Sequence, residues 1–163
     1  VRGRQEVGPR ALGHRSLLAI ATSWDSRERL NRIKARQWYR PVAPVVPEDD
    51  AARYFDTPRA SPYMSFALAV KEPLREEIPA VVHFDNTSRL QTVVPADEPW
   101  LYSLLKDVGA TCDHPVLINT SFNTKGRPLV NTIVEALHIM ETHKADLDAV
   151  LVEDTLFSWR SMD

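Results

Sequence analysis

The spacing of apolar residues divides this chain into short strands and amphipathic helices. Helical spacing predicts helices from about residue 26 to Pro41, over 98–108, and from about residue 132. Short apolar runs predict strands over 63–70, 81–84, 90–94, 115–118, 149–152 and 155–159. The mixture of elements predicts an α/β fold with a mixed sheet.

Local signals indicate where the helices begin and end. Asp25 and Glu28 form a capping-box-like pair at the first helix, where Leu30, Ile33 and Trp38 are predicted to form its apolar face. Gly109 is the predicted C-cap of the second helix. Thr132 and Glu135 predict a capping box at the third, whose inner face would carry Val134, Leu137 and Met140.

Four segments are predicted to lie outside the regular elements. Residues 1–16 are punctuated by glycine and proline, which favour turns. Residues 45–62 are polar and proline-rich, so we expect a surface excursion. Residues 85–88 read as a hairpin turn between two strands, and residues 119–123 as a polar loop after a buried strand.

Composition indicates one soluble globular domain. The chain has 163 residues, 44% of them hydrophobic and 26% charged, with a net charge of −2 that argues against general nucleic-acid binding. Cys112 is the sole cysteine, which excludes an intrachain disulfide and a cysteine-based zinc site. Without an apolar run of membrane-spanning length or a signal peptide, we expect a cytoplasmic location. The chain starts with Val and enters a motif directly, so we expect a piece of a larger protein.

The charges are distributed unevenly along the chain. Residues 1–40 carry ten Lys and Arg against three Asp and Glu, whereas residues 41–163 carry ten against nineteen. In the basic part the arginines alternate with Gly, Pro and small apolar residues. This alternation is typical of a site where backbone N–H and guanidinium groups converge on an anion, most commonly a phosphate.

The first candidate site lies in the glycine-punctuated segment that ends in Arg15-Ser16. Gly8 and Gly13 would let the backbone approach a ligand closely, while Arg10, Arg15 and Ser16 meet its oxygens. The spacing does not match a Walker loop. An ordinary turn-rich segment with surface arginines is an equally simple interpretation.

The second candidate is Lys34-x-Arg36-x3-Arg40-Pro41. Lys34 and Arg36 would diverge on a straight helix and converge only if the helix ends there, which Pro41 favours. Such a cluster could neutralise charge on a phosphoryl group. The alternative is a cationic helix C-terminus favoured by the helix dipole.

Two further groups of polar residues remain. Asn119, Ser121 and Asn123 follow a buried strand, where α/β proteins often place ligand contacts, although the same residues also form turns. No Gly-x-Ser-x-Gly elbow surrounds Ser121, which argues against a serine hydrolase. His83 and Asp85 alone would leave a metal under-ligated, so no metal site is predicted and Arg89 is read as their cross-strand partner.

The order of these motifs resembles the C-terminal domain of the nodulation and antibiotic-tailoring O-carbamoyltransferases. The resemblance covers nearly the whole chain and rests on four motifs, centred on Gly8-Pro9-Arg10-Ala11-Leu12-Gly13, Lys34-x-Arg36-x3-Arg40-Pro41, Ser88-Arg89-x-Gln91-Thr92 and Asn119-Thr120-Ser121-Phe122-Asn123. That domain is similar in fold to the YrdC-type synthases. The resemblance therefore implies an open, twisted mixed sheet with helices around a positively charged cavity, in a single domain over residues 1–163.

The resemblance also implies a reaction. ATP with Mg²⁺ and carbamoyl phosphate would give carbamoyl-adenylate and pyrophosphate, and the carbamoyl group would then pass to an acceptor hydroxyl. The second step would belong to an N-terminal domain of actin/Hsp70-like fold that holds its own metal and is absent from this chain. Neither a membrane nor a nucleic acid is an expected partner, and the oligomeric state, a homodimer included, is left open.

Combined with the motifs, the resemblance assigns roles to individual residues. Lys34 and Arg36 would contact the phosphates during activation, and Arg89 the adenylate phosphate or the carbamoyl oxygen. The remaining predicted contacts to substrate or nucleotide are Arg10, Arg15, Ser16, Arg40, Asn119, Ser121 and Asn123. Two alternatives stay open: a threonylcarbamoyl-adenylate-synthase-like enzyme, and a non-catalytic module that binds a nucleotide or RNA.

Overall fold

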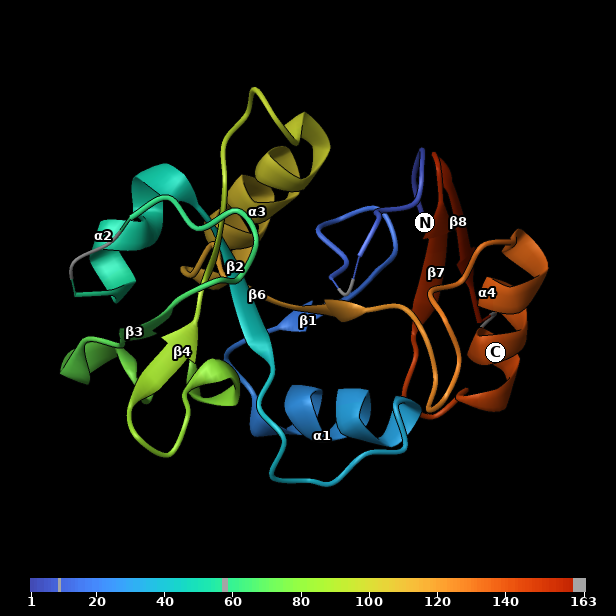
Figure 1. The fold of residues 1–163 in the computed structure, drawn as a ribbon, viewed down its shortest axis with the longest axis horizontal. Helices are drawn as coiled ribbons and strands as arrows, with labels where there is room; N and C mark the ends of the chain where they lie inside the picture. The colour runs from blue at the N-terminus through green and yellow to red at the C-terminus, as the bar shows by residue number, and fades with distance from the viewer. Residues whose placement is uncertain (9, 57–58, 160–163) are drawn as a thin grey trace.

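A four-stranded mixed sheet lies at the centre of the computed structural model, which describes residues 1–8, 10–56 and 59–159 (Figure 1). Its strands, in spatial order, are β1 (Ser16–Ile20), β6 (Leu117–Ser121), β2 (Ala43–Pro47) and β5 (Gln91–Val93). β6 pairs antiparallel with both β1 and β2, whereas β5 pairs parallel with β2. The predicted α/β class and mixed sheet are confirmed.

Helices cover both faces of this sheet. Alternate residues of a strand point to opposite faces, and the two core clusters follow this alternation. The larger core joins α1 (Trp24–Ile33) to Leu17, Val46 and Ile118. The smaller core joins α3 (Pro99–Cys112) to Val45, Val93 and Leu117. The sheet therefore lies between α1 and α3 (Figure 1).

The remaining elements flank the central sheet. One side carries α2 (Ala51–Tyr54) and the two-stranded sheet of β3 (Ala67–Ala69) and β4 (Thr87–Arg89). The other side carries α4 (Ile133–Thr142) and the hairpin of β7 (Ala149–Val152) and β8 (Thr155–Ser158). Short 3₁₀ turns span Glu48–Asp50, Glu72–Leu74 and Pro79–Val81.

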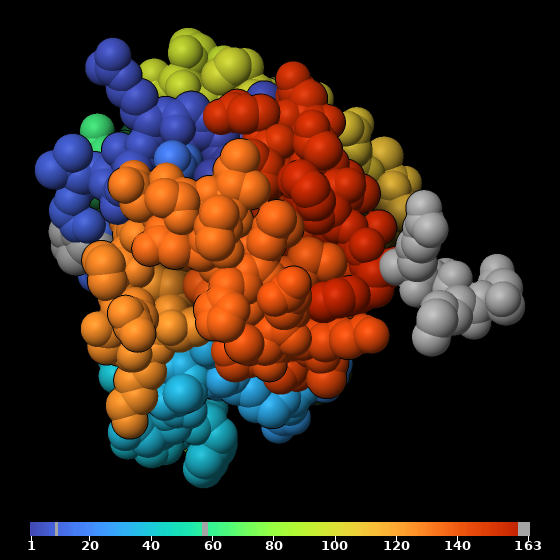
Figure 2. All heavy atoms as spheres, turned by 90° about the vertical axis from the view of Figure 1, so that its right-hand side faces the viewer, coloured from blue at the N-terminus to red at the C-terminus, as the bar shows by residue number. Residues whose placement is uncertain are grey.

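The N-terminal segment is attached to the β7–β8 hairpin. The Val1 ammonium donates to Leu151 O at 2.7 Å, and Glu153 N donates to Val1 O at 2.9 Å. Figure 2 shows this face of the molecule, with the first residues lying against the last strands. None of the helices in the described ranges combines the length and the apolar composition needed to cross a bilayer.

The capping box predicted at α4 is confirmed. Thr132 is the N-cap: Glu135 N donates to its hydroxyl at 3.2 Å, and Thr132 N donates to the Glu135 carboxylate at 2.9 Å. Val134, predicted on the inner face of the helix, is exposed instead, whereas Met140 is buried.

We expect Thr132→Ala to lower the free energy of unfolding by about 1 kcal/mol, because one helical N–H loses its acceptor. Thr132→Ser keeps the hydroxyl and should remain close to wild type. Urea unfolding of both variants checks this prediction. An equal loss in both would show that the Thr132 methyl group, not the cap, supplies the stability.

Several predicted boundaries were wrong at the helix ends. α1 is capped by Ser23, whose hydroxyl accepts from Asp25 N, and not by Asp25 itself. Trp38 lies beyond the helix and is exposed. α3 continues past Gly109 to Cys112 and is capped by Asp113 at φ 62°. Gly109 serves packing, because a Cβ there would lie 2.9 Å from the ring of Pro115.

The predicted surface excursion over 45–62 was wrong, since it begins inside β2, an interior strand of the sheet. Its two prolines concealed it, because proline lacks the N–H that a central strand needs. β2 pairs with β6 over Ala43–Val45 and with β5 over Val45–Pro47. Each proline therefore has a partner strand on one side only. Residues 57–58 of this segment lie outside the described residues.

The predicted hairpin around residues 85–88 was also wrong. Residues 81–84 are not a strand, and β4 and β5 join different sheets. The predicted strand over 63–70 is reduced to β3, and Tyr63 is exposed. Short apolar runs identify buried segments, but they do not identify the strand with which each one pairs.

Candidate anion-binding site

One cavity of about 310 Å³ collects most of the predicted site residues. It opens between the end of α1, β4, the end of β6 and the loops that follow Gly8 and Ser121. Its lining consists of Arg10, Ala11, Lys34, Arg36, Arg40, Pro41, Met64, Arg89, Asn119, Thr120, Ser121 and Asn123. Among these described residues five are cationic and none is acidic, which suits a polyanionic ligand. Pro9 of the first motif lies outside the described residues.

The end of α1 brings Lys34 and Arg36 to the same wall. Lys34 is the C-cap of the helix, and Ala35 at φ 42° is left-handed, so the chain reverses between the two cations. This is the condition under which the sequence predicted that they would converge. The turn at Ala35 lies six residues before Pro41, so the helix ends earlier than the proline itself requires.

Lys34 connects the end of α1 with the end of β6. Its Nζ donates to Ser121 Oγ at 3.0 Å and to Asn123 Oδ1 at 2.6 Å. It also donates to the carbonyl oxygens of Ser121 at 2.6 Å and Asn123 at 3.3 Å. Ser121 Oγ in turn donates to Asn123 Oδ1 at 2.8 Å. The two motifs predicted to cooperate are thus in direct contact.

The crowding of cations lowers their pKa values. Burial, together with the nearby charge of Arg36, lowers the pKa of Lys34 to about 8. Burial, with the charges of Arg40, Arg27 and Arg89, lowers the pKa of Arg36 to about 10. Burial and Arg10 also lower the pKa of Arg89. These charged groups lose hydration, and no acidic side chain is among the described residues that line their cavity. An anion that enters the cavity would therefore stabilise them.

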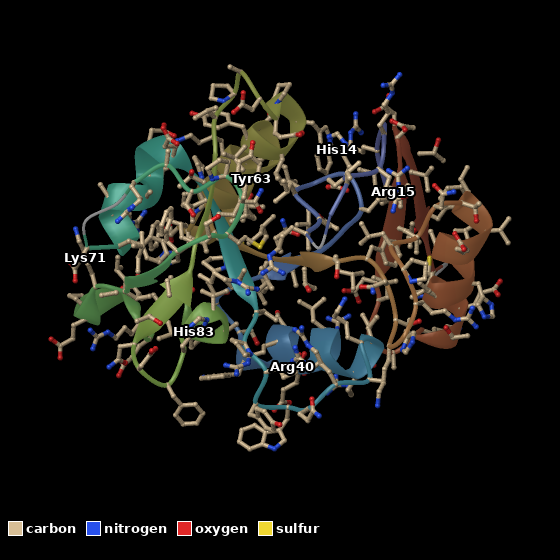
Figure 3. The ribbon with its side chains drawn as sticks, viewed as in Figure 1. His14, Arg15, Arg40, Tyr63, Lys71 and His83 are labelled. Atoms are coloured by element: carbon tan, nitrogen blue, oxygen red, sulfur yellow. The ribbon has the colours of Figure 1, made fainter. Side chains whose placement is uncertain are left out.

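Arg15 and Ser16 do not belong to this cavity. Arg15 is buried, and its guanidinium donates to four backbone carbonyls, those of Arg2, Gly3, His14 and Val130, at 2.8–3.3 Å. Figure 3 shows Arg15 beside the N-terminal segment, well away from Arg40, which lies beside α1. Ser16 faces a separate cavity lined by Leu17, Trp100 and Phe122. The structure therefore gives Arg15 a structural role.

Sequence reasoning missed two polar residues that support the cavity, Glu6, which is partly buried, and Gln91, which is buried. Glu6 accepts from the backbone N–H groups of Leu12 at 2.6 Å and His14 at 2.8 Å, which fixes the loop that carries Arg10. Gln91 accepts from Asn119 Nδ2 at 2.6 Å and donates to Leu12 O at 3.2 Å. Both lie inside the motifs of the resemblance, but a motif does not distinguish residues that bind from those that support.

Asn119 differs from its predicted setting. It lies within β6 rather than in a loop, and its side chain is almost fully buried. Its amide also donates to Ala11 O at 3.1 Å, so it too holds the loop before Gly13. Its Oδ1 is buried without a partner in the described part of the chain.

His83 and Asp85 both contact the hydroxyl of Thr87. His83 Nδ1 lies 3.1 Å from Thr87 Oγ1, and Asp85 accepts from the same hydroxyl at 2.7 Å. Within the described ranges, no group of three or more His, Cys, Asp or Glu side chains could hold a metal ion. The described lining of the cavity consists instead mainly of cations, amides and hydroxyls.

Comparison with known proteins identifies the family. The family model described as carbamoyltransferase C-terminus matches residues 1–158. The chain is 38% identical to the nodulation protein NolO of Bradyrhizobium diazoefficiens over 156 residues, which cover 93% of this chain and 28% of that protein. It is 44% identical to the nodulation protein U of Sinorhizobium fredii over 125 residues, which cover 77% of this chain and 22% of that protein. The chain thus spans about a quarter of the length of these relatives. It belongs to the carbamoyltransferase C-terminus family.

Proposed function

We propose that this chain activates a carbamoyl group by forming carbamoyl-adenylate from ATP and carbamoyl phosphate. The observation that carries the proposal is the contact of Lys34 with Ser121 and Asn123 on the wall of a cavity lined by four arginines. Joining two polyanions requires fixed cations that offset their mutual repulsion. Membership of the carbamoyltransferase C-terminus family supports the choice of group.

The atoms balance when one water is consumed. Water releases phosphate from carbamoyl phosphate and leaves carbamate. A carbamate oxygen then attacks the α-phosphorus of ATP, and the bond from that phosphorus to the pyrophosphate oxygen breaks. Each turnover yields one carbamoyl-adenylate, one phosphate and one pyrophosphate.

The residues that line the cavity have different roles in this proposed reaction. Lys34 and Arg36 contact the ATP phosphates and stabilise the charge that develops on the leaving pyrophosphate. Arg10, Arg40 and Arg89 hold the second anion, and Ser121 and Asn123 hydrogen-bond the adenylate. Mg²⁺ would enter with ATP and would neutralise part of the phosphate charge, and the described lining of the cavity adds no carboxylate ligand to it.

Transfer to an acceptor hydroxyl is proposed for a part of the protein outside this chain. About three quarters of the length of NolO and of nodulation protein U lies beyond the region that matches. An N-terminal domain of actin/Hsp70-like fold would hold the acceptor and the metal of the transfer step.

The test is pyrophosphate release from ATP with and without carbamoyl phosphate. Release that requires carbamoyl phosphate supports the proposal. Release that requires threonine and bicarbonate instead would favour a threonylcarbamoyl-adenylate synthase. If a folded sample neither releases pyrophosphate nor binds ATP, the proposal is overturned.

The affinity for pyrophosphate should fall as the pH rises through about 8. The pKa of Lys34 is lowered to about 8, so its ammonium is charged below that pH and loses its proton above it. Titration calorimetry from pH 7 to 9 should show a larger drop in wild type than in Lys34→Ala, because the ionisation of pyrophosphate is the same in both. Parallel curves would contradict a role for the Lys34 charge.

A further inference from the structure

Asn31 lies under the cation cluster, on the buried side of α1. Asn31 is 3% exposed, and both polar atoms of its side-chain amide hydrogen-bond the segment that follows the helix. Its Oδ1 accepts from Arg36 Nε. Its Nδ2 donates to Trp38 O at 3.1 Å and to Arg40 O at 3.4 Å. One side chain thus binds the Arg36 side chain and the backbone on which Arg40 is carried.

This anchorage opposes a repulsion between cations that no acidic group among the described cavity residues relieves. Arg36 lies near Arg40, Arg27 and Arg89, and Asn31 Oδ1 is the one side-chain acceptor for it in the described part of the chain. Arg36 Nη2 is buried and has no hydrogen-bond partner among the described residues. Before an anion enters, the Arg36 guanidinium would move away from its neighbours unless another contact held it.

We infer that Asn31 is a positioning residue, which holds Arg36 and Arg40 on the cavity wall before the anion binds. The inference rests on the anion-binding role of the cavity in the proposed function. Holding the donors in place removes the cost of ordering them when the ligand arrives.

The absence of charge on the Asn31 side chain is important for this positioning role. An aspartate has nearly the same shape and would also accept from Arg36. Its negative charge, however, would pair with the Arg36 guanidinium and compete with the ligand, and its oxygens would face the carbonyls of Trp38 and Arg40. An amide holds the guanidinium without neutralising it.

The test is the dissociation constant of inorganic pyrophosphate for the wild-type chain, Asn31→Asp, Asn31→Ala, Arg36→Ala and the Asn31→Ala/Arg36→Ala double variant. We expect Asn31→Asp and Asn31→Ala each to weaken binding by about tenfold or more. Since Asn31 acts partly through Arg36, the double variant should bind far more tightly than additive single effects predict. Asn86→Asp makes the same chemical change in a turn outside the cavity and should bind like wild type.

A spectroscopic measurement on the wild-type chain complements the variants. The Nε–H of Arg36 should exchange slowly with solvent, as a buried, hydrogen-bonded proton does, and should exchange rapidly in Asn31→Ala. The wild-type exchange rate depends on the contact itself, and measuring it does not require any variant to fold.

The outcomes separate the two proposals. If wild type binds no pyrophosphate, the anion-binding role of the cavity is overturned, and this inference with it. If wild type binds while Asn31→Asp and Asn31→Ala bind within about twofold of it, this inference alone is overturned. Rapid exchange of the Arg36 Nε–H in wild type would also overturn it.

Discussion

Lys34→Ala is expected to lower the release of pyrophosphate that depends on carbamoyl phosphate by about 10²-fold or more. The ammonium supplies charge at the point where Ser121 and Asn123 meet the cavity. Its loss removes the proposed phosphate contact and leaves the four oxygens that it now bonds without their shared donor.

Lys125→Ala is the matched control, because Lys125 is exposed on the loop that follows Asn123 and does not line the cavity. It should retain wild-type release. Initial rates with saturating ATP and carbamoyl phosphate, together with melting curves, separate chemistry from unfolding. Wild-type rates in a folded Lys34→Ala variant would remove Lys34 from the reaction.

Arg15→Ala is expected to lower the free energy of unfolding by about 3 kcal/mol or more. The buried guanidinium gathers carbonyls from the first residues of the chain and from Val130, which are far apart in sequence. Its removal leaves these acceptors without their shared donor and creates a void where the side chain lay. The N-terminal segment should therefore loosen from the body of the domain.

Urea unfolding measures this loss, and Arg4→Ala, at an exposed position two residues after Arg2, serves as the control. The control should change stability by no more than about 0.5 kcal/mol. An Arg15→Ala variant that keeps wild-type stability but loses affinity for pyrophosphate would return Arg15 to the role of a ligand contact.

The contrast between Arg10 and Arg15 shows what a motif leaves undecided. Both arginines belong to one glycine-punctuated segment and look equally suited to a phosphate. In the structure Arg10 lines the cavity, whereas Arg15 turns to the opposite side and satisfies backbone carbonyls. Spacing indicates that the cations are needed, but it carries no information on the direction of each side chain.

Some strands were predicted from the sequence, whereas others were missed. The strands β7 and β8 were predicted correctly from their apolar runs, although their pairing as a hairpin was not predicted. β2 was missed because its partners, β5 and β6, lie far away in the chain and its prolines resemble loop signals. The local sequence pattern indicates which residues are buried and where helices are capped. Strand pairing depends on contacts between distant segments, which form only when the chain folds.

The sequence by itself determined the α/β class, the capping box at Thr132, and the residue types of an anion site in two separated motifs. These follow from periodicity, local hydrogen bonding and charge, which neighbouring residues set among themselves. Only the tertiary structure decided that Lys34 bonds Ser121 and Asn123, that Arg15 supports the fold, and that Asn31 anchors Arg36. Lys34 and Ser121 are 87 residues apart, and such contacts depend on how α1 and β6 pack rather than on either segment alone.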